Sequence, residues 1–567
     1  MKKRIFCWIM AVLMTLSTGG IMTNQEVNAA EIPMVTDGVI QARGVWHRPN
    51  VTGTETNLAG ICDVLDTLQK AGINLVFLET FYHGMTVYRS SLIPYYTGFD
   101  AFDYTPYPDY LSAFVAEAGK RGIEVHAWVE DFYVGVKENY FTQHLSHWLM
   151  LTEDGAIRQS EGEDFGGYLF LDPANPEVRA YLIKYYNELL TNFPTIAGLN
   201  LDYIRYPVSS QSDDTGYTEV AMNGFAAQHG ITFPENATRE DKVKAVGTRY
   251  GEWVTYRASQ VTTFVGEVFE MVKTQHPGVL LSTAVFPEQG KSFGDKKQDF
   301  NTWLARGYLD IITPMAYYDD IPTLKRALEA MLPGLSACYC YAGISPTYHN
   351  LSNDQVLSQM KTTIDVGADG FVFFGSQSIL NKPGYIELLA DTLPTNTLLP
   401  HTGAKVLIDT TAREVERKLT EAGEPAEKVQ ELIAQLSQLE DMADDTNASK
   451  LEQVQKQLRL LVKYNLATYV TAENLPLVQQ NLNLLYRWIT VKTDRLITKA
   501  GRPAEEETPE QPEPPVESPC QQPEKKDPQQ PAKPNHLARN LGLGAAIAAA
   551  AAAVVACFHA IRKGRKK

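Results

Sequence analysis

Cysteine is scarce in this chain, which has 6 among its 567 residues. Three of the six lie near the ends, which leaves Cys62, Cys338 and Cys340 for the folded part. So few thiols exclude a disulfide framework, even for a protein outside the cell. Cys338 and Cys340 alternate on one predicted strand, and we interpret them as small buried apolar residues rather than a metal-binding pair.

Basic residues are outnumbered as well. Lysine and arginine together count 51 against 67 aspartates and glutamates, which gives a formal net charge of −16. A nucleic-acid-binding protein needs a positively charged surface, and no long basic face occurs before the extreme C-terminus. The charge therefore argues against a nucleic-acid partner.

Several short catalytic and metal-binding motifs are also missing. The sequence has no glycine-rich phosphate loop, no serine-centred nucleophile elbow, and no zinc-protease or EF-hand pattern. His144 and His147 share one face of a predicted helix, and we interpret them as helix-surface histidines. We therefore predict neither a metal ion nor a cofactor.

What remains is the composition of a globular protein, with 44% hydrophobic and 21% charged residues. A chain of 567 residues is too long for one ordinary core. Two or more structural units with additional tails are expected.

The ends of the chain carry targeting signals. Residues 1–30 have a basic start, a short apolar run and a small-residue site at Ala29 and Ala30, a pattern that predicts a secretory signal peptide. Residues 541–561 are long enough to span a bilayer, although alanine makes them only weakly hydrophobic. The basic residues 562–567 then fit the cytoplasmic side. We predict an exported cell-surface protein anchored in the plasma membrane.

Residues 501–536 precede the predicted anchor and are dense in Pro, Glu and Gln, with almost no aliphatic side chains. Such a segment cannot bury a core and predicts an extended, semi-rigid stalk. A stalk of this kind suits the thick envelope of a Gram-positive-type cell.

Residues 31–400 alternate short apolar runs with amphipathic, helix-like segments. Strands that are apolar on both faces and separated by helices favour a parallel sheet. Eight such runs favour a (β/α)8 TIM barrel over an open sheet. The runs are QARGVWHRP, INLVFLETF, IEVHAWVED, GLNLDYIRYP, VLLSTAVFPE, YLDIITPMAYY, ACYCYAGIS and GFVFFGSQ.

The predicted strands end in carboxylates, aromatic rings, histidine and arginine. A TIM barrel places its active site at the carboxyl ends of the strands. Aromatic faces stack on sugar rings, and carboxylates, Arg and His hydrogen-bond hydroxyl groups. We therefore predict a poly- or oligosaccharide substrate. The candidate binding residues are Trp46, His47, Glu79, His126, Trp128, Glu130, Asp131, Arg205, Tyr206, Tyr317 and Tyr318.

Hydrolysis of a glycosidic bond needs two carboxyl groups. Asp202, which interrupts an apolar strand, is the predicted nucleophile, and the charge of Arg205 would hold it ionised. Glu288 is the leading acid, because neighbours such as Phe286 would raise its pKa. The substitutes for Glu288 are Glu130, Asp131 and Glu79. In the structural alternative, Asp202 and Arg205 form an ion pair that seals the barrel rim.

Five motifs within these strands and helices together resemble the glycosyl hydrolase-like family 10. The resemblance spans Ala42 to about Gly375 and implies a (β/α)8 barrel, glycoside hydrolysis in an exported bacterial protein, and a site role for Asp202. Two segments depart from the usual family pattern, LETFYHG after the second strand and Glu130-Asp131 after the third. The motifs that carry the resemblance are RGVW at 43–46, RGIEVHAWV at 121–129, LDPANPEVRAYL at 171–182, LDYIRYP at 201–207 and YLDIITPMAYY at 308–318.

Residues 401–500 have apolar side chains at helical spacing, separated by Gln, Lys and Glu. This pattern predicts a small all-α domain that spaces the barrel from the stalk or contacts a partner. Its expected core residues are Leu432, Leu436, Leu439, Leu451, Leu458 and Leu485.

Two functions from different classes stay open on this basis. The first is a surface-anchored glycoside hydrolase, and the second is a non-catalytic glycan-binding or envelope-organising protein. A metal-dependent polysaccharide deacetylase is a more distant third. A second carboxyl group about 5 to 10 Å from Asp202 across the barrel mouth would favour the hydrolase.

Overall fold

The structure is a computed structural model that describes residues 40–501, except 51–52, 137, 160, 163–165, 208–213, 336 and 394–396. The predicted signal peptide, membrane anchor and basic tail lie outside the described residues, and so does the predicted stalk after residue 501. Of the helices that the structure describes, none combines the length and the apolar character needed to cross a membrane.

Eight parallel strands close into a barrel, as predicted. Within the described residues the main sheet runs in the order β1-β11-β10-β9-β8-β7-β4-β2-β3, and β1 also pairs with β2, which closes the ring. The short β3 is antiparallel to β2. The barrel strands are β1 (Ala42–His47), β2 (Leu75–Tyr82), β4 (Glu124–Val129), β7 (Gly198–Leu201), β8 (Leu280–Val285), β9 (Ile311–Pro314), β10 (Tyr339–Ile344) and β11 (Gly370–Phe374).

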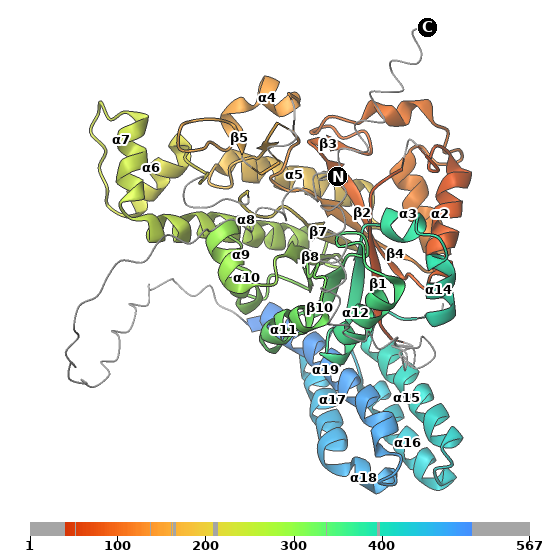
Figure 1. The fold of residues 1–567 in the computed structure, drawn as a ribbon. Helices are drawn as coiled ribbons and strands as arrows, with labels where there is room; N and C mark the ends of the chain where they lie inside the picture. Colours follow the sequence, from red (N-terminus) through yellow and green to blue (C-terminus); the bar gives the residue numbers. More distant parts are fainter. Residues whose placement is uncertain are drawn as a thin grey trace, which may run out of the picture.

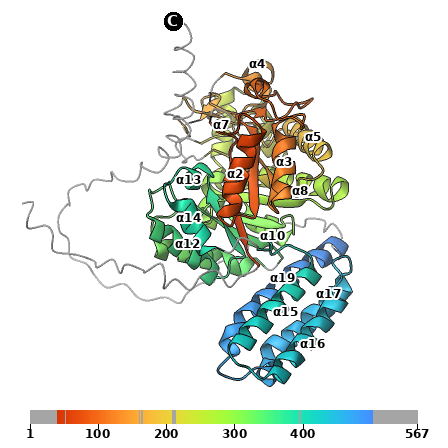
Figure 2. The same ribbon diagram turned by 90° about the vertical axis from the view of Figure 1, so that its right-hand side faces the viewer.

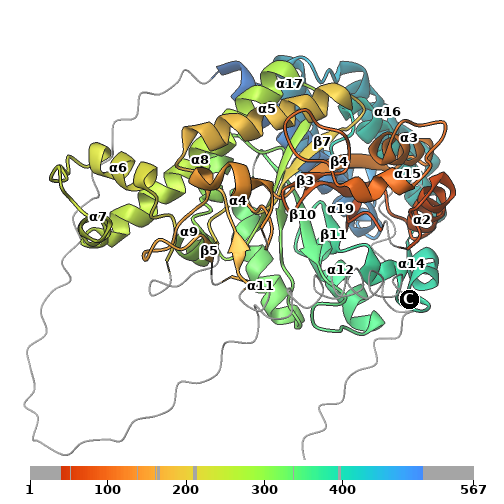
Figure 3. The same ribbon diagram turned by 90° about the horizontal axis from the view of Figure 1, so that it is seen from above.

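A helix follows each barrel strand and covers the outside of the ring (Figures 1 and 3). Several of these helices begin at a side-chain cap, such as Asn57 before α2 and Asp109 before α3. Gly122 and Gly367, with φ of 68° and 100°, end turns that lead into β4 and β11. The covering helices are α2 (Leu58–Lys70), α3 (Tyr110–Lys120), α5 (Pro176–Asn192), α8 (Tyr250–Gln275), α10 (Phe300–Ala305), α11 (Ile321–Met331), α12 (Asn353–Asp365) and α14 (Tyr385–Thr392).

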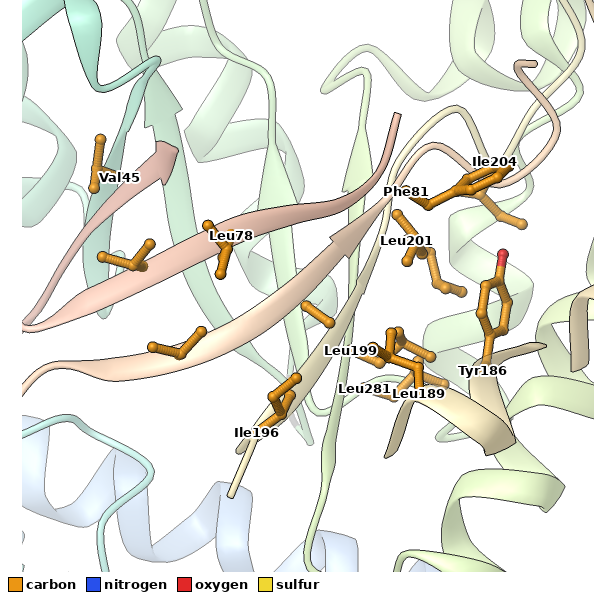
Figure 4. Close-up of a cluster of buried hydrophobic side chains, with 14 of the residues drawn as sticks. Val45, Leu78, Phe81, Tyr186, Leu189, Ile196, Leu199, Leu201, Ile204 and Leu281 are labelled. Atoms are coloured by element: carbon orange, nitrogen blue, oxygen red, sulfur yellow. The ribbon is translucent and has the colours of Figure 1, made fainter. Parts of the chain in front are cut away.

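The main hydrophobic core lies between the sheet and the covering helices. Leu199 and Leu201 of β7 point to the same side as Leu281 of β8 and pack with Tyr186 and Leu189 of α5 (Figure 4). The alternate residues of each strand point into the barrel, where Trp46 Nε1 donates to Asn200 Oδ1 at 3.2 Å. The interior is thus filled by side chains, as expected for eight strands.

The connections at the carboxyl ends of the strands are longer than those at the amino ends and carry additional elements. These elements are β3 (Met85–Thr86), α4 (Tyr140–His144), β5 (Arg158–Gln159), β6 (Tyr168–Leu169), α6 (Glu219–Gln228), α7 (Arg239–Gly247), α9 (Gln289–Lys296) and α13 (Gln377–Leu380). Figure 1 shows β3, α4, β5, α6 and α7 among these elements in the upper part of the molecule.

A helical bundle packs against the opposite side of the barrel, at the amino ends of the strands (Figures 1 and 2). Arg487 and Trp488 of α19 both bond Asp369, the residue before β11, at 2.7 and 3.0 Å. Arg495 pairs with Asp310, the residue before β9. The bundle consists of α15 (Ala404–Glu421), α16 (Ala426–Met442), α17 (Ala448–Leu460), α18 (Leu466–Tyr469) and α19 (Leu475–Gly501).

Candidate active site

Three carboxyl groups lie at the carboxyl ends of three adjacent strands, on the face that we call the mouth of the barrel. Glu79 in β2 is level with Trp128 in β4, and Trp128 is level with Asn200 in β7. Glu130 and Asp202 follow two residues after Trp128 and Asn200. Since side chains alternate along a strand, Glu79, Glu130 and Asp202 are directed to the inner side of the ring.

Asp202 is held as a hydrogen-bond acceptor. The indole Nε1 of Trp128 donates to Asp202 Oδ2 at 3.0 Å, and the backbone N–H of Tyr203 donates to Oδ1 at 2.7 Å. Burial raises the pKa of Asp202, while the Tyr203 N–H, the charge of Arg205 and the Trp128 bond oppose that rise. The two N–H bonds stabilise the ionised carboxylate and so oppose the effect of burial.

The carboxyl group of Glu130 lies in a different environment from that of Asp202. Glu130 is 1% exposed, and its carboxyl group accepts a hydrogen bond from the backbone N–H of His83 at 3.0 Å. Burial raises the pKa of Glu130 well above its usual value, and the neighbouring charges of Glu79 and Asp202 raise it further. This environment favours a protonated carboxyl group near neutral pH.

Arg48 connects the carboxyl groups. It pairs with both oxygens of Glu79, at 2.6 Å through Nε and 2.7 Å through Nη2. The same Nη2 lies 3.5 Å from Glu130 Oε1. The guanidinium group also lies over the rings of Tyr82 and Trp128, 4.4 and 5.5 Å from their centroids. Arg48 thus places a positive charge between the buried carboxyl groups of Glu79 and Glu130.

Two backbone turns in the left-handed region supply the N–H groups that reach the acids. Tyr203, which donates to Asp202, has a φ of 49°, and His83, which donates to Glu130, has a φ of 50°. Non-glycine residues rarely adopt this conformation, which costs about 1 to 3 kcal/mol. Such strain is concentrated at functional sites in proteins, and here it aims two donors at two carboxyl groups.

Half-buried aromatic rings surround the acids. Tyr317 stacks on Phe374, with ring centroids 5.2 Å apart, and its neighbour Tyr348 lies at 5.7 Å. Tyr203 stacks on Tyr133 at 4.8 Å. Burial raises the pKa of Tyr317 well above its usual value, and the nearby charge of Asp202 adds to the rise. These rings provide apolar faces of the kind that stack on sugars.

Arg205 does not form the ion pair with Asp202 that the structural alternative predicts. Its guanidinium group pairs with both oxygens of Glu161, each at 2.9 Å. Its charge still lowers the pKa of Asp202, as expected, but without a salt bridge. The interpretation of Asp202 and Arg205 as a sealing ion pair is therefore wrong, because Glu161 occupies the guanidinium group.

Glu288 is exposed rather than enclosed by Phe286, contrary to expectation. It stands directly before α9, and its carboxylate accepts a hydrogen bond from the hydroxyl of Tyr318. Phe286 lies instead between Arg205 and Lys296, whose charged groups are 5.5 and 4.0 Å from its ring centroid. Glu288 thus lacks the apolar enclosure that the sequence predicts for it.

Four other predicted binding residues are fully buried away from the mouth. His47 bonds Glu55 and Ser376, and Asp131 accepts a bond from Tyr186 of α5. His47 directly follows the inward-facing Trp46, and Asp131 directly follows the inward-facing Glu130, so the side chains of His47 and Asp131 point outward. Trp46 is buried inside the barrel beneath the mouth. The residues placed wrongly at the mouth are His47, His126, Asp131 and Tyr206.

The sequence analysis missed several residues of the site. Arg48 follows directly after a predicted strand end, so the rule that selected His47 could have found it. Tyr203 is next to the selected Asp202, and Phe374 lies in the eighth predicted strand, from which no residue was selected. Glu161 lies in the long connection between β4 and α5, and no local pattern indicates that it reaches Arg205.

Among the described residues, the His, Cys, Asp and Glu side chains whose ligand atoms converge closely enough for a metal ion are Glu124, His126 and His401. They lie at the amino end of β4 and before α15, on the side of the barrel opposite the mouth. At the mouth, Arg48 pairs with Glu79 and lies 3.5 Å from Glu130.

Glu130→Gln is expected to stabilise the protein at alkaline pH. The raised pKa means that the folded state resists ionisation of Glu130, so the wild-type protein loses stability as pH rises above about 4.3, the pKa of an unfolded glutamate. Glutamine cannot ionise and can still accept the His83 N–H. The stability gain should grow by up to about 1.4 kcal/mol per pH unit. Thermal unfolding at pH 5 to 8 measures it, and a gain that is equal at all pH values contradicts the assignment.

A family model described as Glycosyl hydrolase-like 10 matches residues 41–333, which cover β1 to α11 and all three acids of the mouth. Among curated proteins, the chain is 25% identical over 279 residues to a glycosyl hydrolase DigH of Escherichia coli strain K12. The match covers 45% of this chain and 57% of the relative, so the chain spans little more than half of that protein. It is also 25% identical over 230 residues to an S-layer-related protein of Niallia circulans, covering 37% of this chain and 14% of the relative.

Solved structures with a similar chain path include the glycoside hydrolase domain of PgaB (BpsB) from Bordetella bronchiseptica. That domain has 12% identity and a TM-score of 0.46, with 62% of this chain and 98% of the domain covered. The catalytic domain of a β-amylase from Paenibacillus polymyxa has 12% identity and a TM-score of 0.42, with 62% and 97% covered.

Proposed function

Since the chain belongs to the Glycosyl hydrolase-like 10 family, we propose that it hydrolyses glycosidic bonds of a poly- or oligosaccharide at the mouth of its barrel. The observation that carries the proposal is the contrast between two buried carboxyl groups on neighbouring strands. Asp202 accepts two N–H bonds that favour its ionised form, whereas burial and negative neighbours favour the protonated form of Glu130. A glycosidase needs such a pair, one ionised and one protonated.

The two carboxyl groups take complementary roles. Glu130 donates its proton to the glycosidic oxygen as the bond to the leaving sugar breaks. Asp202 supports the positive charge that develops at the anomeric carbon, either by attacking that carbon or by taking a proton from the attacking water. Trp128 and Tyr203 orient the Asp202 carboxylate for this task.

Arg48 and the aromatic rings position the substrate and the acids. Arg48 lowers the pKa of Glu79 against the effect of burial, and the nearby charge of Glu79 raises the pKa of Glu130. The half-buried rings of Tyr317 and Phe374 offer apolar surface for stacking on a sugar ring. Tyr317 and Phe374 stack on each other with ring centroids 5.2 Å apart, so each ring supports the orientation of the other.

The experiment compares the full chain with two single variants, Glu130→Gln and Glu288→Gln. Each protein is purified in detergent and incubated with polysaccharides and purified cell-wall glycans while new reducing ends are counted. We expect the Glu130 variant to lose about 10²- to 10⁴-fold in kcat and to lose the alkaline limb of its pH–rate profile. The Glu288 variant, changed at an exposed residue, should keep most of its activity.

The reverse result would move the acid to Glu288 and leave the hydrolase proposal intact. If no glycan yields reducing ends with the wild-type protein but one binds, the second function holds, that of a non-catalytic glycan-binding or envelope-organising protein.

We also propose that the protein is exported and anchored in the plasma membrane, with the barrel outside the cell. The support is sequence pattern alone, the basic and apolar start of the chain, the apolar run at 541–561 and the basic residues 562–567. Protease added to intact cells should degrade the barrel and leave a small membrane-bound C-terminal fragment. A barrel that stays intact until the cells are lysed contradicts this placement.

A further inference from the structure

A second group of polar side chains converges at the opposite end of the barrel from the mouth. The carboxylate oxygen Oε1 of Glu124 lies 2.7 Å from His126 Nε2 and 2.8 Å from His401 Nε2. Glu124 and His126 are on β4, and His401 is 277 residues after Glu124, just before α15. The three ligand atoms lie within 4.8 Å of one another.

The two histidine rings are held in place before any ligand binds. The hydroxyl of Tyr341 in β10 lies 2.7 Å from His401 Nδ1, the nitrogen that faces away from Glu124. The ring of His126 packs on Gly198 of β7, where a Cβ atom would lie 2.3 Å from Nδ1. A partner on the second nitrogen and tight packing are what fix the rings of metal-binding histidines.

We propose that Glu124, His126 and His401 form a binding site for a divalent transition metal ion of the Zn²⁺ class. Two histidines and one glutamate are a known ligand set for Zn²⁺, with water completing the four positions. Bonds of about 2.0 to 2.2 Å at tetrahedral angles separate the ligand atoms by about 3.3 Å. The Glu124 carboxylate therefore withdraws by about half an ångström from each histidine when the ion binds.

The charge and the exposure of the group suit a cation. Glu124 supplies a negatively charged carboxylate, and its Oε2 makes no hydrogen bond among the described residues. The side chain of Glu124 is 27% exposed, whereas those of His126 and His401 are 0% and 8% exposed. An ion and its water can thus enter on the Glu124 side.

The position of the site indicates a structural role. The backbone carbonyl of His401 accepts a hydrogen bond from Lys492 of α19 at 3.0 Å, so the segment that supplies His401 also holds the helical bundle. A metal ion at this point would fasten the bundle to β4 of the barrel. The site is independent of the proposed hydrolysis, which takes place at the other end of the barrel.

The test uses the full chain, purified in detergent, stripped with a chelator and titrated with Zn²⁺ against a chromophoric competitor. We expect one Zn²⁺ per chain, and a melting temperature that rises by about 3 °C or more at a hundredfold excess over Kd. Co²⁺ in place of Zn²⁺ should give the visible absorption of a four-coordinate site.

Glu124→Gln and His401→Gln should each weaken Zn²⁺ binding at least tenfold and abolish the rise in melting temperature. His276→Gln is the matched control, because His276 bonds Asn187 outside this group. The glutamine variants keep hydrogen-bonding groups, and their metal-free melting temperatures show whether they fold. Binding that is substoichiometric, or equal in all variants, overturns the proposal.

Discussion

Replacing Asp202 by asparagine is expected to lower kcat by about 10³-fold or more while the protein still folds and binds its glycan. The variant keeps an oxygen that accepts the Tyr203 N–H, but its amide group cannot attack the anomeric carbon or take a proton from water. The melting temperature should change little, since burial already disfavours the Asp202 charge. Release of reducing ends and calorimetric glycan binding, measured together, separate catalysis from binding.

The control for this variant is Asp391→Asn, on the exposed side of α14 and away from the mouth. It changes the same chemical group and should leave kcat within about twofold. An Asp202 variant that releases reducing ends at the wild-type rate contradicts the assignment of Asp202. A variant that no longer binds glycan would make Asp202 a binding residue instead.

Arg48→Met is expected to destabilise the protein by about 3 kcal/mol or more at pH 7. Its loss leaves Glu79, which is 0% exposed, without the two hydrogen bonds that balance its charge. Glu130 and Asp202 then lie near the negative charge of Glu79, which Arg48 no longer balances. Urea unfolding at pH 7 measures the change in the free energy of unfolding.

The lost stability should depend on pH. Without Arg48, the pKa of Glu79 in the folded state rises further above its unfolded value of about 4.3. The destabilisation is therefore smallest below that pH and grows as the pH rises towards neutrality. The double variant Arg48→Met with Glu79→Gln should recover most of the loss at pH 7.

Arg89→Met provides the control for the loss of an arginine at the surface. Arg89 pairs with Asp100 on the outside of the protein, where its side chain is 72% exposed. Such a pair is worth about 0 to 1 kcal/mol, so this variant should unfold almost as the wild type does. An Arg48 variant that is equally stable would show that water reaches Glu79 and balances its charge.

Much of the barrel follows from the sequence. Runs such as INLVFLETF are apolar on both strand faces because one face meets the barrel interior and the other meets the covering helices. Glycines such as Gly122 stop a helix and turn the chain into the next strand. Seven of the eight predicted runs contain their barrel strand whole, and the eighth, INLVFLETF, ends one residue before β2 does, at Phe81.

The site is less predictable, because a strand end does not tell which of two adjacent side chains faces inward. His47 and Asp131 were selected together with Trp46 and Glu130, but alternation sends one of each pair into the outer core. His126 comes earlier in β4 than the mouth and reaches the opposite end of the barrel. Register between strands, which resolves both questions, is not visible in one sequence.

Long-range pairing is the second limit. Arg205 pairs with Glu161, which is 44 residues earlier, and Arg48 pairs with Glu79, which is 31 residues later. Neither pair follows a helical or strand spacing. The contrast between Asp202 and Glu130 depends on such contacts, so the acid could not be chosen among the candidate glutamates until the side chains were placed.

The most direct test of the hydrolase account is a crystal structure of the Asp202→Asn variant with a bound oligosaccharide. We expect an anomeric carbon within about 3.5 Å of the side chain at position 202 and the glycosidic oxygen within about 3.2 Å of Glu130. The distance between the two carboxyl positions then predicts retention at about 5 Å or inversion at about 6.5 to 9.5 Å. A glycan bound elsewhere, or a glycosidic oxygen beside neither Glu130 nor any other carboxyl group, would contradict the account.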